Sequence, residues 1–182
     1  LDARCRRPQE PNQGSARGAS THRRSPKRQG SGERTHAPER AREWAALIPL
    51  TLDASVVVKW FYPTLRESDL RQAQAIQRAY AADEVALFQP PHWRAEVAAV
   101  LARLSPGRAR RDVTDLCLLD VETVDTAETY LRATGLAISL SQHLFDTFYH
   151  AVALSVPGCT LVTADTRYFR KAQHIGRILQ LS

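Results

Sequence analysis

The stretch that decides the fold is residues 50–61, LTLDASVVVKWF. An apolar run beginning at Leu47 and Ile48 predicts a short buried strand that ends on Asp53. Ala54 then opens a predicted helix, whose apolar residues recur at Val56, Val57, Trp60 and Phe61. A strand that turns at once into a helix starts a βαβ unit. Asp53 is therefore expected at the carboxyl edge of a parallel sheet, where ligands bind, although it is equally well placed to cap the helix.

The rest of the chain continues this alternation. After a turn over 63–69, we predict further strands over 85–88, 121–125, 160–163 and 177–181. Helices are predicted over 70–82, from Pro91 to Leu104, and over 108–119, 126–134, 141–156 and 164–172. Gly135 is expected to end the helix over 126–134, and the helix over 141–156 to turn Phe145, Phe148, Tyr149 and Val152 inward. This order predicts a three-layer α/β/α fold with a mainly parallel central sheet.

The positive charge is concentrated in the first 42 residues. They carry eleven Lys and Arg against four Asp and Glu, whereas residues 43–182 carry fourteen against fifteen. The pI of about 9.6 therefore does not describe the folded part, and basicity is no argument that this part binds nucleic acid.

Residues 1–42 are rich in Arg, Gly, Ser and Pro and have few large apolar side chains. We expect a disordered basic extension, followed by a folded α/β domain over residues 43–182. The extension is either a cationic arm that holds RNA or DNA, or a solvated segment outside the functional domain. The absence of Met from the chain favours the second interpretation.

The cysteines and the hydropathy indicate a cytoplasmic protein. Cys5, Cys117 and Cys159 are odd in number and widely spaced, which excludes a fully paired disulfide framework and a cysteine metal site. We find no apolar run long enough to span a bilayer and no signal peptide, so no membrane association is expected.

Four acidic residues occupy unusual positions. Asp53 and Asp165 each follow a predicted strand, and Glu96 and Asp146 lie at the margins of apolar helix faces. Each has a structural explanation, such as a helix cap or a pair with a nearby Arg or His. Together they predict four carboxylates at one crevice, which would repel one another without a counter-charge. An all-oxygen site of this kind suits Mg²⁺ or Mn²⁺, and phosphodiester hydrolysis is its natural reaction.

Four segments resemble the PIN-domain ribonucleases, and among them the VapC toxins of bacterial toxin–antitoxin pairs. They are residues 52–61, 90–97, 140–147 and 161–169, in the family's order. The resemblance implies a PIN fold and a Mg²⁺- or Mn²⁺-dependent endoribonuclease. It also implies that the acidic quartet is Asp53, Glu96, Asp146 and Asp165, and that Thr163 holds a water on the metal.

The same resemblance implies a homodimer and a small antitoxin whose tail blocks the site. One position departs from the family pattern. Members commonly carry Asn three residues after the helix Glu, where this chain has Ala99. This departure affects a hydrogen bond that supports the site more than the metal ligands themselves.

Basic residues and histidines elsewhere have two interpretations. The side chains that could contact RNA phosphates, or simply give solubility, are Lys59, Arg94, Arg108, Arg110, Arg111, Arg167 and Arg170. His92, His143 and His150 are interpreted as surface or hydrogen-bonded histidines rather than catalytic bases.

Two other functions compete with the ribonuclease. The first is a catalytically silent module that binds RNA or an antitoxin, which Ala99 and the charged extension favour. The second is a phosphotransfer enzyme of the haloacid dehalogenase type. That chemistry needs a second Asp two residues after the first, and Ser55 occupies this position.

Overall fold

The computed structural model describes residues 46–62 and 69–182. The strands are β1 (Ile48–Leu52), β2 (Val85–Gln89), β3 (Glu122–Thr123), β4 (Thr160–Thr163) and β5 (Ile178–Gln180). The α-helices are α2 (Ala54–Phe61), α3 (Leu70–Ala81), α4 (Trp93–Leu104), α5 (Ala109–Cys117), α6 (Ala127–Leu140), α7 (Leu144–Ser155) and α8 (Thr166–Ala172), and a 3₁₀ turn, η1, covers Gln173–Ile175. The predicted extension over 1–42 and most of the predicted turn over 63–69 lie outside the described residues.

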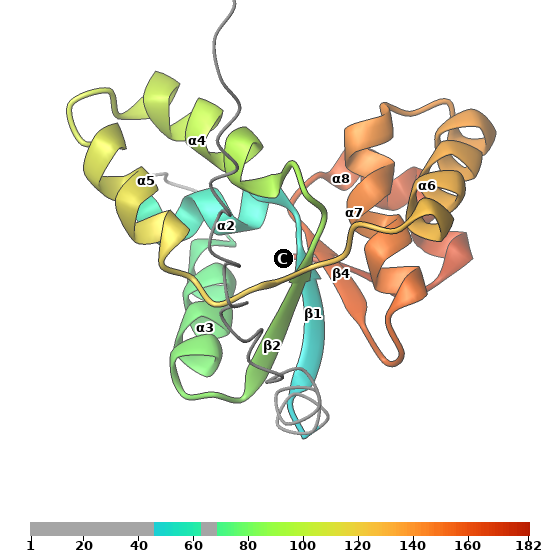
Figure 1. Ribbon diagram of the computed structural model, residues 1–182, viewed down its shortest axis with the longest axis horizontal. Helices are drawn as coiled ribbons and strands as arrows, with labels where there is room; N and C mark the ends of the chain where they lie inside the picture. Colours follow the sequence, from blue (N-terminus) through green and yellow to red (C-terminus); the bar gives the residue numbers. More distant parts are fainter. Residues whose placement is uncertain (1–45, 63–68) are drawn as a thin grey trace, which may run out of the picture. The chain divides into compact units, whose positions relative to one another are not determined.

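The five described strands form one sheet in the order β3-β2-β1-β4-β5, and every pairing is parallel. The chain runs outward from β1 through β2 to β3, and then returns to β4 and β5 on the other side of β1. Figure 1 shows β2 on one side of β1 and β4 on the other. Right-handed crossovers in these two directions place helices on opposite faces of the sheet. The predicted three-layer α/β/α architecture is therefore confirmed.

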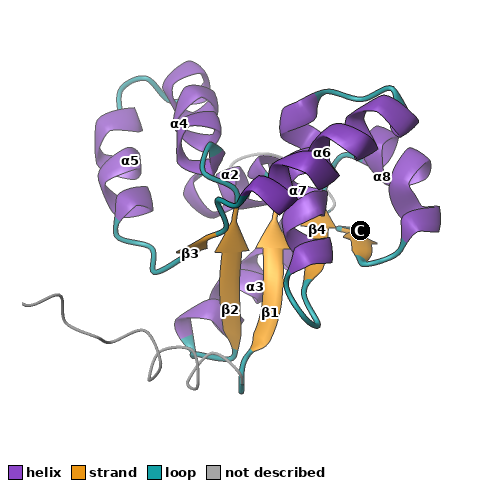
Figure 2. Cartoon of the chain, turned by 45° about the vertical axis from the view of Figure 1, so that its right-hand side comes forward, coloured by secondary structure: helices purple, strands orange, loops and turns teal. Residues whose placement is uncertain are grey.

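The layers follow from which helices touch which strands. On one face, α2 and α3 contact β4 and β2, and on the other, α7 contacts β1, β2 and β4 (Figure 2). Fully buried Leu52, Leu87 and Leu161 fill the space between these layers, and Trp93 closes the core from α4. The order in which the chain adds strands reverses between β1 and β4. In open parallel sheets, such a switch point opens a crevice beyond the carboxyl ends of the strands.

The prediction that Gly135 ends a helix is wrong. Helix α6 continues through this residue to Leu140, and Ser141 ends it in a left-handed conformation with φ of 49°. Tertiary packing explains the difference, because buried Ala133 of α6 packs against Phe148 and Val152 of α7. Such packing outweighs the roughly 1 kcal/mol by which glycine weakens a helix.

The prediction that Phe145 points into the core is also wrong. Helix α7 begins at Leu144 rather than Ser141, and the Phe145 side chain is 49% exposed, whereas Phe148, Tyr149 and Val152 are buried as predicted. Phe145 shares their helix face, but it lies in the first turn, at the carboxyl edge of the sheet, where no strand covers it.

Smaller differences concern the ends of elements. The strand predicted over 121–125 is reduced to Glu122–Thr123, and α4 begins at Trp93, after a turn that contains Pro91. Cys117 is exposed and Cys159 buried, and both are free thiols. Within the described part of the chain, no helix combines the length and the apolarity that crossing a membrane requires.

Candidate metal centre

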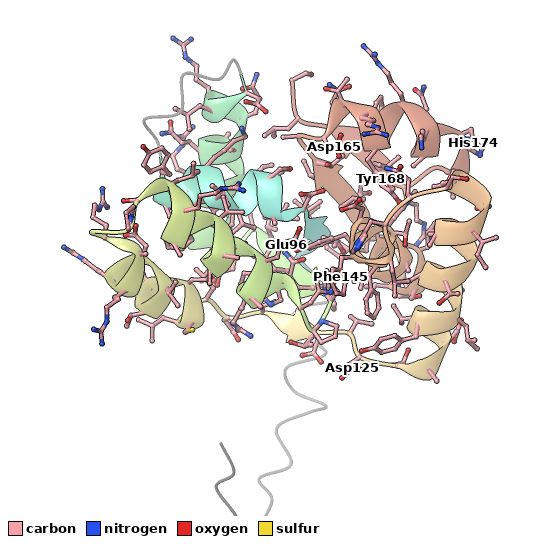
Figure 3. All side chains as sticks on the ribbon, turned by 90° about the horizontal axis from the view of Figure 1, so that it is seen from above. Glu96, Asp125, Phe145, Asp165, Tyr168 and His174 are labelled. Carbon is pink, nitrogen blue, oxygen red and sulfur yellow. The ribbon has the colours of Figure 1, made fainter. Side chains whose placement is uncertain are left out.

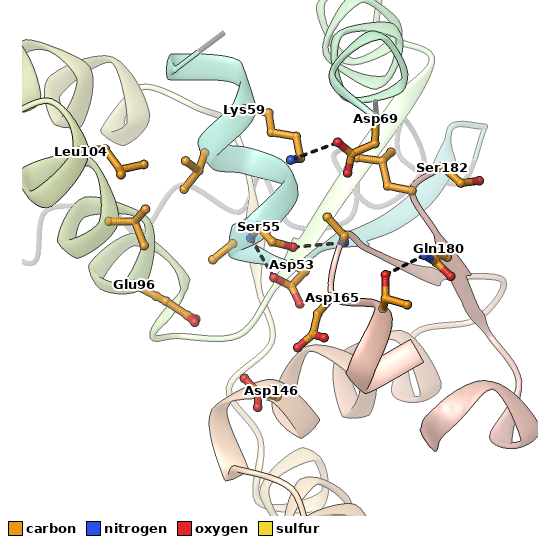
Figure 4. Close-up of a pocket in the computed structure, with 16 residues that line it drawn as sticks. Asp53, Ser55, Lys59, Asp69, Glu96, Leu104, Asp146, Asp165, Gln180 and Ser182 are labelled. Atoms are coloured by element: carbon orange, nitrogen blue, oxygen red, sulfur yellow. Dashed lines mark hydrogen bonds and ion pairs between the residues drawn. The ribbon is translucent and has the colours of Figure 1, made fainter. Parts of the chain in front are cut away.

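A pocket of about 920 Å³ opens at the carboxyl edge of the sheet. Its lining includes Asp69 and the four acids that the sequence selects: Asp53, Glu96, Asp146 and Asp165. These four come from the end of β1, from α4, from the first turn of α7 and from the residue before α8. Figure 4 shows the four carboxylates pointing toward a common space. The fold therefore brings together all four acids that the sequence selects, although they are spread over more than a hundred residues.

Asp53 serves as a helix cap and as a pocket residue at once. One carboxylate oxygen accepts a hydrogen bond of 2.8 Å from the Ser55 backbone N–H, which caps α2. The other accepts a 2.9 Å hydrogen bond from the Thr163 hydroxyl. Burial raises the pKa of Asp53 above its ordinary value, the bonds from Ser55 and Thr163 oppose this shift, and the charge of Asp165 adds to it.

Thr163 connects two of the acids. Its fully buried hydroxyl donates its single proton to Asp53, and its oxygen accepts a 3.0 Å hydrogen bond from the Asp165 backbone N–H. Asp165 in turn caps α8, with one oxygen accepting from the N–H groups of Arg167 and Tyr168 at 2.8 and 3.0 Å. Thr163 therefore fixes the orientation of Asp53 and the backbone position of Asp165.

Glu96 is held by a tyrosine. The hydroxyl of Tyr149, on α7, donates a 2.8 Å hydrogen bond to Oε2 of Glu96, on α4. Burial raises the pKa of Glu96, the Tyr149 bond lowers it, and the charges of Asp53 and Asp146 raise it further. Ala99 cannot supply the hydrogen bond that the family pattern places at its position, and Tyr149 gives Glu96 a bond from another helix.

Negative charge dominates the pocket. Burial raises the pKa of Asp146, and the charges of Asp53 and Asp165 add to the shift. Lys59 is the one basic residue among the described residues that line the pocket, and its ammonium lies 3.2 Å from the Asp69 carboxylate. With only 3% of its side chain exposed, Lys59 does not present the free surface charge expected of a phosphate contact.

The three histidines play structural parts. His150 is fully buried, with its ring nitrogens bonded to the Tyr168 hydroxyl at 3.1 Å and the Gly176 carbonyl at 2.8 Å, which confirms the prediction that its hydrogen bonds are satisfied. His143 caps α7 by accepting a 3.4 Å hydrogen bond from the Phe145 N–H. For His92 the prediction is wrong, because both ring nitrogens are buried and neither makes a hydrogen bond to a residue that the structure describes. Its Nε2 lies 3.6 Å from Glu96 Oε2, and burial lowers the pKa of His92.

Sequence reasoning missed the part played by Tyr149, which it assigned to the core alone. A signal was present, because Tyr149 follows Asp146 by three residues and so shares its side of the helix. The contact with Glu96, 53 residues away, depends on how α4 and α7 pack. Likewise, nothing local indicated that Lys59 would be buried against Asp69.

The donor set fits a hard divalent cation. Its ligands would all be carboxylate oxygens, which Mg²⁺ and Mn²⁺ prefer. The negative charges of Asp53, Asp146 and Asp165 each raise the pKa of at least one other acid of the pocket, and a cation would offset this repulsion. As the side chains stand, no group of three or more His, Cys, Asp or Glu among the described residues is close enough to hold one ion. The chemistry of the pocket therefore fits a metal, and coordination requires the carboxylates to draw together.

Comparison with known proteins agrees with this fold. A chain in the crystal structure of VapBC2 from Rickettsia felis, bound to a DNA fragment from its promoter, superimposes with a TM-score of 0.51. The match covers 74% of the present chain and 99% of the other at 12% identity, which shows likeness of fold. No curated protein sequence gives a significant match. The family model described as PIN domain matches residues 50–175, more than half of the chain. The chain therefore belongs to the PIN domain family.

Proposed function

We propose that this protein is a metal-dependent endoribonuclease, a VapC-like toxin that hydrolyses RNA phosphodiester bonds with Mg²⁺ or Mn²⁺. The observation that carries the proposal is the convergence of Asp53, Glu96, Asp146 and Asp165 on one pocket. PIN domains are generally nucleases, so membership of the family supports a hydrolase. The preference for RNA rests on the resemblance to VapC toxins and on the fold shared with VapBC2.

In this proposal the four acids act together as metal ligands, and two other residues orient two of them. Asp53, Glu96, Asp146 and Asp165 would hold the cation, which when bound neutralises charge on the phosphate and orients the attacking water. Thr163 keeps the Asp53 carboxylate turned toward the pocket, and Tyr149 does the same for Glu96.

Asp146 is suited to accept a proton. Its carboxylate makes no hydrogen bond to any residue that the structure describes, so one oxygen could hold the cation while the other accepts the proton. The water oxygen forms a bond to phosphorus while its proton passes to Asp146. The bond from phosphorus to one ribose oxygen then breaks, and that oxygen takes a proton from solvent.

Several partners follow from the same proposal. RNA is the substrate, a small antitoxin protein blocks the pocket, and two copies of the chain form a homodimer in the cytoplasm. An antitoxin that places an Arg or Lys among the four carboxylates would add positive charge to a pocket whose described lining has Lys59 alone, paired with Asp69. Co-purification with the protein encoded beside this chain tests the antitoxin directly.

The decisive experiment is cleavage of single-stranded RNA by the purified full-length protein. We expect cutting with added Mg²⁺ or Mn²⁺, none with EDTA, and none by Asp53→Asn or Asp146→Asn at wild-type circular dichroism. Asp115→Asn is the matched control, because Asp115 is an exposed acid on α5 that does not line this pocket. Full cutting by Asp53→Asn would refute the assignment. RNA binding without any cutting would instead support the catalytically silent module.

A further inference from the structure

The Phe145 ring is an exposed aromatic group next in the chain to the carboxylate pocket, although it is not part of the pocket lining. It is 49% exposed and directly precedes Asp146, which lines the pocket. Phe145 and Glu96 are labelled in the view from above (Figure 3). His92 contacts both residues: its ring stacks on that of Phe145, and its Nε2 lies 3.6 Å from Glu96 Oε2. An apolar ring in this position contributes little to the core, because half of it is in water.

The part of the Phe145 ring that is not exposed packs against other aromatic rings. The Phe145 and His92 rings are stacked, with centroids 4.7 Å apart and planes 30° apart. His92 in turn packs against the buried rings of Phe148 at 5.6 Å and Tyr149 at 5.1 Å. The His143 ring flanks Phe145 at 5.1 Å. Phe145 is therefore held in place by aromatic contacts that reach the core, which lowers the entropic cost of binding a further planar group on its exposed side.

The charge of the pocket makes such a contact useful. The four carboxylates repel phosphates. Lys59 is the one basic residue of the described pocket lining, and its ammonium is already paired with Asp69. A bound metal would attract one phosphate, but it would not hold the adjoining nucleotides. Stacking of a base on an aromatic ring does not depend on the charge of the backbone, and it is available to any unpaired base.

We propose that Phe145 is a stacking subsite for one unpaired nucleobase of the RNA strand, next to the phosphate that is cut. This inference rests on the proposed ribonuclease function and makes it more specific. It requires an unpaired base beside the cut, because a base held in a duplex cannot lie on the ring. His92, whose ring is stacked against that of Phe145, is the positioning residue.

The test combines a change in the protein with removal of a base from the substrate. Short RNA oligonucleotides, each with one abasic nucleotide at successive positions around the cut, are cleaved by wild-type protein and by Phe145→Ala. We expect one abasic position to raise the KM of the wild type about 5- to 100-fold, with a smaller change in kcat. The same position should have no added effect on Phe145→Ala, whose KM for intact RNA is already raised by a similar factor.

Further variants separate stacking from packing. Phe145→Trp keeps an aromatic surface and should restore the KM, whereas Phe145→Leu keeps apolar bulk without a π-face and should not. Leu131→Ala is the matched control, since Leu131 is an apolar residue on α6 with 74% exposure and is not next in the chain to any of the four acids.

The possible outcomes are distinct. If wild-type protein cuts RNA but no abasic position couples to Phe145→Ala, the stacking subsite is refuted while the ribonuclease stands. Equal KM values for Phe145→Leu and Phe145→Trp also refute it. If wild-type protein cuts no RNA with either metal, the proposed function fails and the subsite with it.

Discussion

Replacing Thr163 with Val should both destabilise the protein and impair the pocket. The change keeps the shape of the side chain but removes the hydroxyl that donates to Asp53 at 2.9 Å and accepts from the Asp165 N–H at 3.0 Å. A hydrogen bond to a charged group contributes about 1.5–3 kcal/mol, and a partly buried N–H without an acceptor costs about 1 kcal/mol. We therefore expect the free energy of unfolding to fall by about 2–4 kcal/mol.

The same substitution should weaken catalysis through Asp53. Removing the Thr163 bond raises the pKa of Asp53 further, because that bond opposes the effect of burial. Loss of a group that orients a metal ligand typically costs about 10- to 100-fold in metal affinity or activity. We expect a loss of this size in RNA cleavage, with more Mg²⁺ needed for half-maximal rate and the acidic limb of the pH–rate profile moved to higher pH.

Urea unfolding, followed by the fluorescence of buried Trp60 and Trp93, measures the stability change. Thr163→Ser is the control, because it keeps the hydroxyl and loses only a methyl group, at a cost of about 1 kcal/mol. The reasoning is refuted if the Val variant lies within about 0.5 kcal/mol of wild type. It is equally refuted if the Ser and Val variants lose the same cleavage activity.

Four further predictions concern the pocket and α6. Tyr149→Phe should lower the unfolding free energy by about 1.5 kcal/mol, at the low end for a hydrogen bond to a charged group because the Glu96 side chain is 36% exposed. Because the Tyr149 bond lowers the pKa of Glu96, its loss should also raise that pKa. An unchanged urea unfolding midpoint would contradict a stabilising hydrogen bond between Tyr149 and Glu96. In EDTA, the melting temperature of the wild type should rise relative to that of Asp146→Asn as the pH falls from neutral toward about 4. This comparison cancels the opposite effect of His92 and His150, whose pKa values are lowered by burial. The folded pKa values of Asp53, Glu96 and Asp146 lie above their unfolded values, so the folded state binds protons more tightly in that range. Added Mg²⁺ should raise the melting temperature at pH 8 and much less at pH 5, and a shift independent of pH would exclude binding to these carboxylates. Gly135→Ala should stabilise the protein by about 0.5–1 kcal/mol, because an added Cβ meets nothing within 4 Å and the residue lies inside α6; destabilisation in thermal unfolding would argue against a continuous helix there.

The sequence alone predicted the layers of this fold and four acids that meet at one pocket. Strands and helices alternate with clear periodicity, and each of the four acids stands beside a buried segment, so local pattern was enough to identify both. Asp53 illustrates why: its place at the end of β1 is set by adjacent residues, which make it a helix cap and a pocket residue together.

The tertiary structure decided what each acid touches and what surrounds the pocket. Tyr149 reaches Glu96, Thr163 links Asp53 to Asp165, and Lys59 is buried against Asp69, in each case across ten to 110 residues of chain. Contacts between distant segments depend on how helices pack on the sheet, which periodicity does not encode. Phe145 shows the same limit, since its helix face predicts burial and only the end of the sheet beside it leaves the ring exposed.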